Sequence, residues 1–597
     1  MRKTETILSI IFKRGQHGLP VQDAYRLLYQ RDLYLCAYGK ICRNEGAMTE
    51  GATPETADSM SLEKIDSIIT LLRSERYRWT PVRRTYIPKK NGKLRGLGLP
   101  TWSDKLLQEV VRMILEAYYE PRFSDCSHGF RQNRGCHTAL REVVQKGRGS
   151  KWFVEGDICA CFEKIDHEIL LNILRESFHD NRFILLIRSL LKAGYLEDWK
   201  FNKTYSGVPA GSIIGPTLSN IVLDRFDKYV EQELIPAYTC GKERKRNPSY
   251  RKAMGLMSKA RKENDWKRVR EFRQQMQSLP AMDPNDPNFR RLWYVRYADD
   301  FLLGLSGPKE EAIEIKEKIT TFLCNNLKLD INSEKTLITH ARDQKAKFLG
   351  YEIHVIHDDS KRGHDGRRCI NGVIGLRVPD QVRKEKRERY MRHGKPASLF
   401  ERTNDDAYST VSRYQAEYRG MVQYYRMAYN LHTLSELKHA TEVSLVKTLA
   451  TKFKTTCTEI YKRYGAQIKT KDGEYKVIRV EVERKLPEKP LVTYFGGITL
   501  KWDKWASIND EPATPIWNGR TELVKRLLAQ ECELCGSRDK IEVHHIRKLA
   551  DLKQKGRAIQ PEWKRVMSAR RRKTLVLCHE CHKSIHGGEY DGDKIAA

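Results

Sequence analysis

Hydrophobic residues recur at helical spacing through the first 80 residues of the chain. Leu62, Ile65 and Ile69, for example, would lie together on one face of an amphipathic helix. The pattern then changes to short stretches with strand character, and residues 90–93 (Lys-Asn-Gly-Lys) favour a turn between them. We therefore predict a helical N-terminal segment followed by a basic β-hairpin over residues 81–100.

Two later strand patterns carry aspartates at their ends. Residues 152–157 form the first pattern and end in Asp157. Residues 292–305 form two apolar strands around a tight turn at Asp299 and Asp300, which is a strong hairpin signal. The chain thus places three carboxylates at strand ends in two distant stretches of sequence.

The adjacent carboxylates of the turn repel each other, and Arg296 is the obvious cation near them in sequence. Such a turn between buried strands is costly unless a divalent metal neutralises it, and hard oxygen ligands suit magnesium. If both patterns belong to one sheet, Asp157 and Asp299 could share two magnesium ions, which would activate a 3′-hydroxyl and stabilise a leaving pyrophosphate. The alternative is an ordinary solvated Asp-Asp turn.

The rest of the chain divides by composition. Residues 240–290 form a basic insert that ends in several prolines, and the chain becomes helical again from about residue 380. Residues 455–525 are basic with some strand character, because Ile478 and Val480 alternate with charged residues.

The net charge of the chain indicates which kind of molecule it binds. Among 597 residues, Lys and Arg number 109 and Asp and Glu number 77, so the net charge is +32. This excess favours a nucleic-acid partner over an anionic membrane surface. A hydrophobic content of 40% argues against a wholly disordered chain, and the sequence has no apolar run long enough for a spanning helix. We expect a cytoplasmic protein without a membrane partner, bacterial in origin or from an organelle.

Four of the 14 cysteines stand in two pairs, Cys532-x-x-Cys535 and Cys578-x-x-Cys581. This is the spacing of a structural zinc site with four thiolate ligands. The other cysteines are scattered, and in a long intracellular chain we expect them to be reduced thiols.

Seven blocks between residues 80 and 355 resemble reverse transcriptases. Tyr297-Ala-Asp-Asp300 resembles their active-site box, and Gly156-Asp157-Ile-x-x-x-Phe162 resembles their other metal-binding motif. The other blocks, in matching order, are Arg83–Pro100, His128–Arg131, Tyr205–Asn220, Leu327–Thr336 and Phe348–Tyr351. The resemblance implies an α+β fold: a right-hand polymerase whose fingers and palm contain an antiparallel sheet, with a helical thumb.

The resemblance also implies residue roles. Asp157 and Asp299 would bind the two magnesium ions, and Asp300 would complete the carboxylate set. The incoming deoxynucleotide triphosphate would contact a further group of residues: Lys89 or Lys90, Arg95, Phe162, Ala210, Gly211 and Lys335.

The interpretation of three of these residues, Phe162, Lys335 and Ala210, stays open. Phe162 would exclude a 2′-hydroxyl, with a plain core residue as the alternative. Lys335 would pair with pyrophosphate, and a structural ion pair is equally compatible with its position. Ala210 stands where many relatives have Gln, which leaves its effect on fidelity open, whereas Gly211 keeps the backbone approach open.

The flanking segments resemble one branch of this family, the group II intron-encoded proteins. Asp32–Thr49 resembles their N-terminal extension, and Tyr418–Arg426 with Ser444–Phe453 resembles their thumb, or maturase domain. The resemblance implies binding of the parent intron RNA and help with its splicing. The alternatives are a maturase that only chaperones RNA, and a reverse transcriptase of a defence or retron system.

The histidines near the cysteine pairs resemble the HNH endonuclease family, a small zinc-containing ββα domain. The resemblance implies that His545 is the general base and that His544 and His586 hold one divalent ion, with His582 as a further candidate ligand. The family's middle Asn is not evident, and Lys573 stands near its place. The alternative is that these histidines only orient the zinc thiolates.

Together these features predict four domains and one function. Residues 1–375 would form fingers and palm, 376–455 the thumb, 456–527 a basic DNA-binding region, and 528–597 the nuclease. The protein would copy intron RNA into DNA from a nick that its own nuclease makes in the target DNA. The intron, the target site and the oligomeric state stay open.

Overall fold

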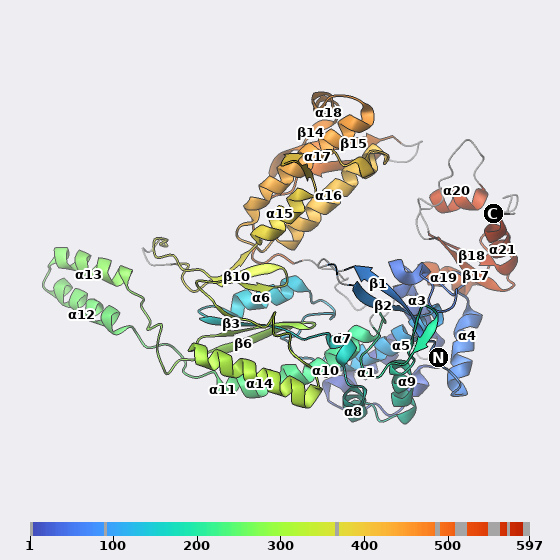
Figure 1. Ribbon diagram of the computed structural model, residues 1–597, viewed down its shortest axis with the longest axis horizontal. Coiled ribbons are helices and arrows are strands. Elements are labelled where there is room, and N and C mark those ends of the chain that lie inside the picture. The colour runs from blue at the N-terminus through green and yellow to red at the C-terminus, as the bar shows by residue number, and fades with distance from the viewer. Residues whose placement is uncertain are drawn as a thin grey trace.

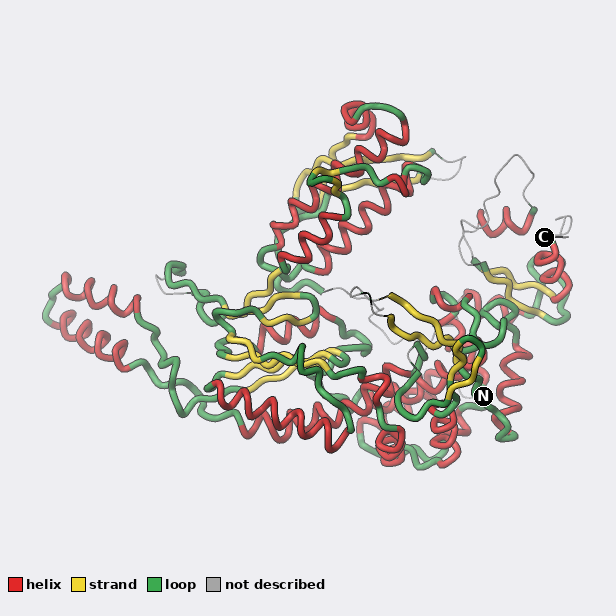
Figure 2. The backbone as a smooth tube through the Cα atoms, in the orientation of Figure 1, coloured by secondary structure: helices red, strands yellow, loops and turns green. Residues whose placement is uncertain are grey.

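The computed structural model describes residues 4–88, 92, 94–209, 211–364, 369–483, 490–507, 522–546, 561–569 and 573–588. It is a mixed α/β structure, and its sheets are antiparallel apart from one short parallel pairing between strands β1 and β4. Figures 1 and 2 show the helical N-terminal region beside the C-terminal domain, with an elongated helical body and a two-helix arm projecting from the central sheet. In the part of the chain so described, none of the helices has the length and apolarity needed to cross a bilayer.

The N-terminal region is helical, as predicted. Its helices are α1 (Thr4–Gln16), α2 (Ala24–Leu27), α3 (Arg31–Ile41), the 3-10 helix η1 (Glu45–Met48), α4 (Leu62–Arg73) and α5 (Trp102–Tyr119). Ser61 caps α4 by accepting a hydrogen bond from the backbone N–H of Lys64. Ile65 and Ile69 are buried on the inner face of α4, so the amphipathic pattern is confirmed.

The predicted basic hairpin is also present. Strand β1 (Val82–Pro88) pairs antiparallel with β2 (Leu94–Leu99) from Arg83↔Leu99 to Pro88↔Leu94. Strands β4 (Tyr195–Glu197) and β5 (Lys200–Asn202) extend it to a four-stranded sheet in the order β2-β1-β4-β5.

The central sheet has the order β6-β7-β3-β8. Its region comprises α6 (Cys136–Lys146), β3 (Trp152–Asp157), α7 (Cys161–Lys164), α8 (His167–Ser177), α9 (Asn181–Leu191), α10 (Gly215–Tyr229), the π-helix η2 (Val230–Leu234), α11 (Ile235–Ala237), β6 (Leu292–Tyr297), β7 (Asp300–Leu305), α14 (Lys309–Leu327) and β8 (Ile338–His340).

Side chains alternate between the two faces of this sheet, and both faces are covered. Val154 packs into the core that contains α10 and α14, whereas Phe153 packs into the core that contains α6. Burial on both faces explains why β6 and β7 have nearly continuous apolar sequences.

The basic insert forms a helical hairpin, α12 (Pro248–Lys262) and α13 (Trp266–Ser278), that projects as an arm (Figure 1). A backbone bridge between Cys240 and Arg290 closes its base. Only Ala253, Ala260 and Val269 of the two helices are buried, so their basic side chains face solvent.

The second core joins the central sheet to the elongated body. The three-stranded sheet of β9 (Ala346–Phe348), β10 (Tyr351–Val355) and β11 (Ile374–Arg377) lies beside the central sheet and α6 (Figure 1). The elongated body itself contains α15 (Asp380–Glu388), β12 (Met391–Arg392), β13 (Lys395–Pro396), η3 (Phe400–Arg402), α16 (Ala407–Tyr424), η4 (Leu431–Leu434), α17 (Ser435–Phe453), α18 (Cys457–Tyr464), β14 (Gly465–Thr470), β15 (Gly473–Val482) and β16 (Leu491–Gly496). The strand character expected after residue 455 is confirmed in β14–β16. Ile478 and Val480 pack with Tyr418 of α16 in one core, so this sheet is continuous with the predicted thumb.

The C-terminal region contains the predicted ββα unit, formed by two paired strands and the helix after them, with a further helix between the strands in sequence. It consists of α19 (Glu522–Ala529), β17 (Ile541–His545), α20 (Glu562–Ala569), β18 (Thr574–Cys578) and α21 (His579–Gly587). β17 pairs antiparallel with β18, and α21 contacts both strands. The region also contacts α3, so the two ends of the chain share one hydrophobic core.

Candidate active sites

The three palm aspartates meet at one end of the central sheet. Asp157 ends β3 and lies opposite Asp300, the first residue of β7, in an antiparallel register. Asp299 occupies the turn before β7, and its backbone carbonyl accepts a hydrogen bond from the N–H of Ile158 at 3.2 Å. The prediction that these strands are neighbours in one sheet is therefore confirmed.

Burial and the neighbouring carboxylates raise the pKa values of Asp299 and Asp300. Burial, together with repulsion from Asp299 and Asp157, raises the pKa of Asp300 to about 7. Burial also raises the pKa of Asp299, with a further contribution from Asp157. Three crowded oxygen donors whose charges repel are a donor set that suits magnesium.

Lys335 lies beside this set. Its Nζ donates to Asp157 Oδ2 at 2.9 Å, and this hydrogen bond raises the pKa of the lysine. Asn332 donates to the same oxygen from Nδ2 at 3.3 Å. The ion pair that the sequence left open is thus present.

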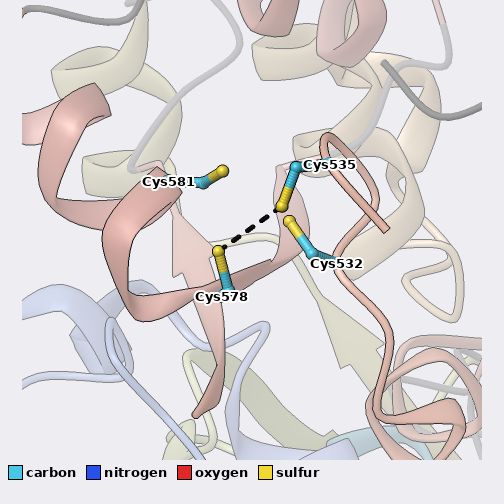
Figure 3. A group of neighbouring side chains, drawn as sticks. All are labelled: Cys532, Cys535, Cys578 and Cys581. Carbon is cyan, nitrogen blue, oxygen red and sulfur yellow. Dashed lines mark hydrogen bonds between the residues drawn. The ribbon is translucent and has the colours of Figure 1, made fainter. Parts of the chain in front are cut away.

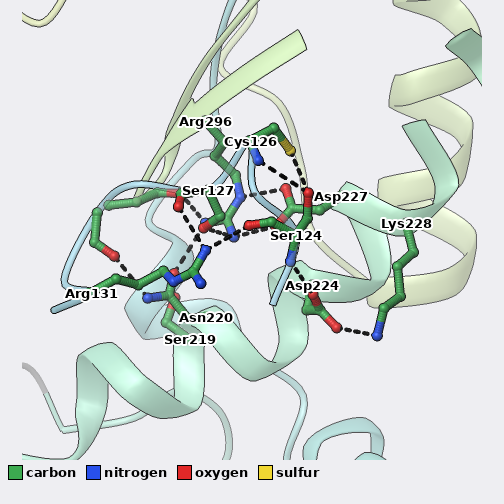
Figure 4. Close-up of polar contacts among 12 residues, drawn as sticks. Ser124, Cys126, Ser127, Arg131, Ser219, Asn220, Asp224, Asp227, Lys228 and Arg296 are labelled. Atoms are coloured by element: carbon green, nitrogen blue, oxygen red, sulfur yellow. Dashed lines mark hydrogen bonds and ion pairs between the residues drawn. The ribbon is translucent and has the colours of Figure 1, made fainter. Parts of the chain in front are cut away.

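Arg296, the obvious cation nearby in sequence, does not pair with the aspartates of the turn. Its Nε and Nη2 instead donate to the two oxygens of Asp227 on α10, at 2.7 and 2.6 Å, and both side chains are 0% exposed. The other N–H groups donate to Asn220, Ser127 and the carbonyl oxygen of Ala298, the residue before the aspartate pair (Figure 4). The arginine therefore braces the backbone of the turn.

Several residues that were predicted to contact the nucleotide lie on or beside the β1–β2 hairpin. Arg95 is exposed on β2, near enough to oppose the rise in the pKa of Asp299. Gly211 has a φ of +99°, and a Cβ there would lie 2.5 Å from the carbonyl oxygen of Gly98, so only glycine fits. A cavity of about 270 Å³ lies between β1–β2 and residues 203–209. Lys89, Lys90 and Ala210 lie outside the described residues.

Phe162 is only half-buried in α7, which differs from the plain-core alternative. Its ring packs edge-to-face against Phe130 at 6.2 Å between centroids, and Phe130 is largely exposed. Its backbone carbonyl accepts from the N–H of Val208 at 2.7 Å, which ties it to the segment beside the cavity.

The four paired cysteines converge. The sulfur atoms of Cys532, Cys535, Cys578 and Cys581 lie within 4.8 Å of one another, and Cys535 and Cys578 are 3.6 Å apart (Figure 3). Burial raises the pKa of Cys578 and Cys581, so these thiolates need a cation beside them. The donor set and its compactness fit zinc.

A second cluster lies nearby and contains a residue that the sequence did not indicate. His544, His582 and His586 group with Asp58, and their donor atoms lie within 4.8 Å of one another. His586 Nε2 lies 2.8 Å from Asp58 Oδ2 and 3.1 Å from His582 Nε2. These histidines therefore face a site of their own. The alternative that they only orient the zinc thiolates required them to surround the sulfur atoms, and they do not.

His545 points away from this cluster. Its Nε2 lies 2.8 Å from the hydroxyl of Tyr38 on α3, and the ring is buried. Burial lowers the pKa of His545 to about 4 and that of His544 to about 4, so both rings are neutral at pH 7.

Three family models match the chain. Residues 87–353 match reverse transcriptase (RNA-dependent DNA polymerase), residues 376–496 match type II intron maturase, and residues 532–582 match AI2M/AI1M-like HNH endonuclease.

Curated proteins are similar over most of the chain. It is 37% identical to the group II intron-encoded protein LtrA of Lactococcus lactis subsp. cremoris, over 98% of this chain and 99% of that protein. It is 34% identical to an uncharacterized 91 kDa protein in the cob intron of Schizosaccharomyces pombe, over 94% of this chain and 69% of that protein. It is 33% identical to protein YkfC of Escherichia coli, over 56% of this chain and 84% of that protein.

Proposed function

The chain belongs to the family of group II intron-encoded proteins, and from this premise we propose which residues carry out its reactions and on which partners. It has a reverse transcriptase domain, a type II intron maturase domain and an HNH endonuclease domain. It is an RNA-directed DNA polymerase that also carries a nuclease domain.

Asp157, Asp299 and Asp300 are the polymerase's catalytic carboxylates. The observation that carries this assignment is the register of β3 with β7, which sets Asp157 opposite Asp300 beside the turn at Asp299. Two magnesium ions, when bound, would activate the primer 3′-hydroxyl and stabilise the leaving pyrophosphate. The protein's own contribution is to hold these oxygens in place on a buried sheet.

Further residues would bind the incoming deoxynucleotide triphosphate. Arg95 would offer a guanidinium to phosphate oxygens, and Lys89 or Lys90 would supply a further positive charge. Gly211 lets the backbone pass close to β2, and the half-buried ring of Phe162 would lie against the sugar and exclude a 2′-hydroxyl. Lys335 would exchange its contact with Asp157 for the pyrophosphate as it leaves.

The RNA partner would be the parent intron. The net charge of +32 and the solvent-facing α12–α13 arm supply basic surface for phosphates. The helix α15, which has no buried residue and carries Arg383, Lys384, Lys386 and Arg387, adds to that surface on the thumb side. The protein would stabilise the folded intron by neutralising phosphate repulsion, while the RNA performs the splicing chemistry.

The C-terminal domain would nick target DNA. Cys532, Cys535, Cys578 and Cys581 would hold a structural zinc ion, and His544 and His586 would hold a divalent ion that polarises the scissile phosphate. His545 would be the base. In the tautomer whose Nε2–H donates to Tyr38, Nδ1 would carry the lone pair that accepts the proton.

Primer extension on an RNA template tests the polymerase assignment. Asp299→Asn removes one ligand charge, and we expect a loss of about 1,000-fold in extension rate, or about 4 kcal/mol of transition-state stabilisation. Asp343→Asn is the matched control, because that carboxylate is exposed and contacts His340 on the same domain. Near-normal extension by the Asp299 variant would reject the assignment; an inactive wild-type protein that still binds intron RNA would instead favour an RNA chaperone.

A further inference from the structure

The N-terminal segment docks onto the nuclease strand through its backbone. The N–H of Ser59 donates to the carbonyl of Val543, and the N–H of Val543 donates to the carbonyl of Met60, each at 3.0 Å. This isolated antiparallel bridge, between Met60 and Val543, holds residues 58–60 alongside β17 and the histidines. Two segments almost 500 residues apart in sequence are thus tied together through their backbones.

This docking fixes Asp58 against the histidine cluster. Its Oδ1 accepts from the backbone N–H of His545 at 2.7 Å and lies 3.3 Å from His582 Nε2. Its other oxygen, Oδ2, faces His586 Nε2 at 2.8 Å. The carboxylate therefore points into the group of imidazole nitrogens, and it is 15% exposed.

His544 provides an independent sign of a missing ligand. Its ring is 4% exposed, and within the described residues neither Nδ1 nor Nε2 has a hydrogen-bond partner. Nδ1 lies 3.6 Å from Asp58 Oδ1, which is too long for a hydrogen bond but suits two ligands of one ion. Buried polar nitrogens without partners are costly, and a bound cation would satisfy the one that carries the lone pair.

We propose that Asp58 is a ligand of the divalent ion in the nuclease site, so that this metal site is built jointly by the N-terminal segment and the C-terminal domain. The inference rests on the nuclease function proposed above and extends it to a residue outside the HNH domain. Three imidazoles and one carboxylate make a mixed nitrogen and oxygen donor set, which suits manganese or another first-row divalent ion better than magnesium. His586, whose side chain is 55% exposed, leaves one side of the site open to a DNA phosphate.

Pulsed EPR of Mn²⁺ bound to the full-length protein tests this inference. The palm carboxylates offer no nitrogen ligand, so nitrogen couplings distinguish the histidine site from the palm site. Asp58→Asn keeps the size of the side chain but loses its charge, and we expect Mn²⁺ affinity at the nitrogen-coupled site to fall by at least about tenfold. Asp58→Glu restores a carboxylate and should recover part of the affinity.

Two further variants separate the possible outcomes. Asp66→Asn is the matched control, because Asp66 lies in the same N-terminal region but pairs with Arg31. The Mn²⁺ affinity of this variant should equal that of the wild type. His586→Ala should lose the nitrogen-coupled Mn²⁺ signal. If His586→Ala loses that signal while Asp58→Asn keeps wild-type affinity, Asp58 is no ligand although the nuclease metal site stands.

The remaining outcomes are equally decisive. If neither variant changes the nitrogen-coupled signal, the proposed nuclease site is itself wrong, and the inference fails with it. If Asp58→Asn binds Mn²⁺ normally but nicks DNA faster than wild type, Asp58 only covers the site, which also overturns the inference.

Discussion

Replacing Asp227 by Asn would leave a buried guanidinium without its counter-ion. All five N–H groups of Arg296 have acceptors: two oxygens of Asp227, and one each on Asn220, Ser127 and Ala298. Asp227 also accepts from the hydroxyl of Tyr294 at 2.8 Å. The substitution keeps the shape of the side chain but removes the negative charge opposite a fully buried cation.

The cost follows from this burial. Removing one partner of a buried ion pair typically destabilises a protein by about 3–5 kcal/mol, because the remaining charge is desolvated and uncompensated. A cost of about 3 kcal/mol corresponds to a fall of about 100-fold in the equilibrium between closed and open states. Since Arg296 also holds the carbonyl of Ala298, the loss should be concentrated at the acidic turn.

Hydrogen exchange measured by mass spectrometry is the assay. Protection of the backbone amides in residues 292–305 should fall by about 100-fold in Asp227→Asn, and primer extension should slow while primer–template affinity is kept. Glu176→Gln is the control, because its partner Arg225 lies on the same helix as Asp227. Both side chains of that pair are exposed, at 60% and 39%, so water can replace the contact and the change should stay below about 1 kcal/mol.

A compensating double variant sharpens the test. Asp227→Leu combined with Arg296→Met removes both charges and should restore most of the lost protection. Unchanged protection and unchanged extension in Asp227→Asn would show that the buried pair does not hold the acidic turn in place.

Three further predictions concern the metal and nucleotide sites. Because the pKa of Asp300 is raised to about 7, the metal-free fold loses stability as the pH rises from about 4 to 7. Mg²⁺ should therefore raise the melting temperature more at pH 8 than at pH 5. An equal rise at both pH values would contradict the repulsion between the carboxylates. Removing zinc with a chelator, or substituting Cys578→Ser, should unfold the C-terminal domain and abolish nicking, while primer extension stays unchanged. If that domain keeps near-wild-type resistance to protease, the result would count against a structural zinc. Phe162→Ala should raise ribonucleotide incorporation relative to deoxynucleotide by about 10-fold or more, measured as a ratio of kcat/KM, and an unchanged ratio would remove Phe162 as the sugar filter.

Local patterns in the sequence predicted much of the fold. The helix that contains Ile65 and Ile69, the hairpin around Asp299 and the alternation at Ile478 and Val480 each depend on periodicity or turn chemistry within a short window. The cysteine pairs were equally readable, because the spacing within each pair is itself the zinc-ligand signature.

The residues that the sequence missed act across long distances. Asp58 lies 487 positions from His545, and nothing in its neighbourhood differs from an ordinary polar loop. Arg296 stands three residues from the acidic turn, yet its partner Asp227 lies 69 positions away on another element. Such pairings are set by tertiary packing, which a one-dimensional pattern does not contain.

The central claim is that Asp157 and Asp299 hold the two metal ions of RNA-templated DNA synthesis. The most direct measurement is a crystal structure of the full chain with RNA template, DNA primer, a non-reactive deoxynucleotide and Mn²⁺, with anomalous scattering used to locate the metal. The account predicts two anomalous peaks about 4 Å apart, each within ligand distance of both carboxylates, between the primer end and the triphosphate. A bound nucleotide with no metal peak between residues 157 and 299 would contradict it.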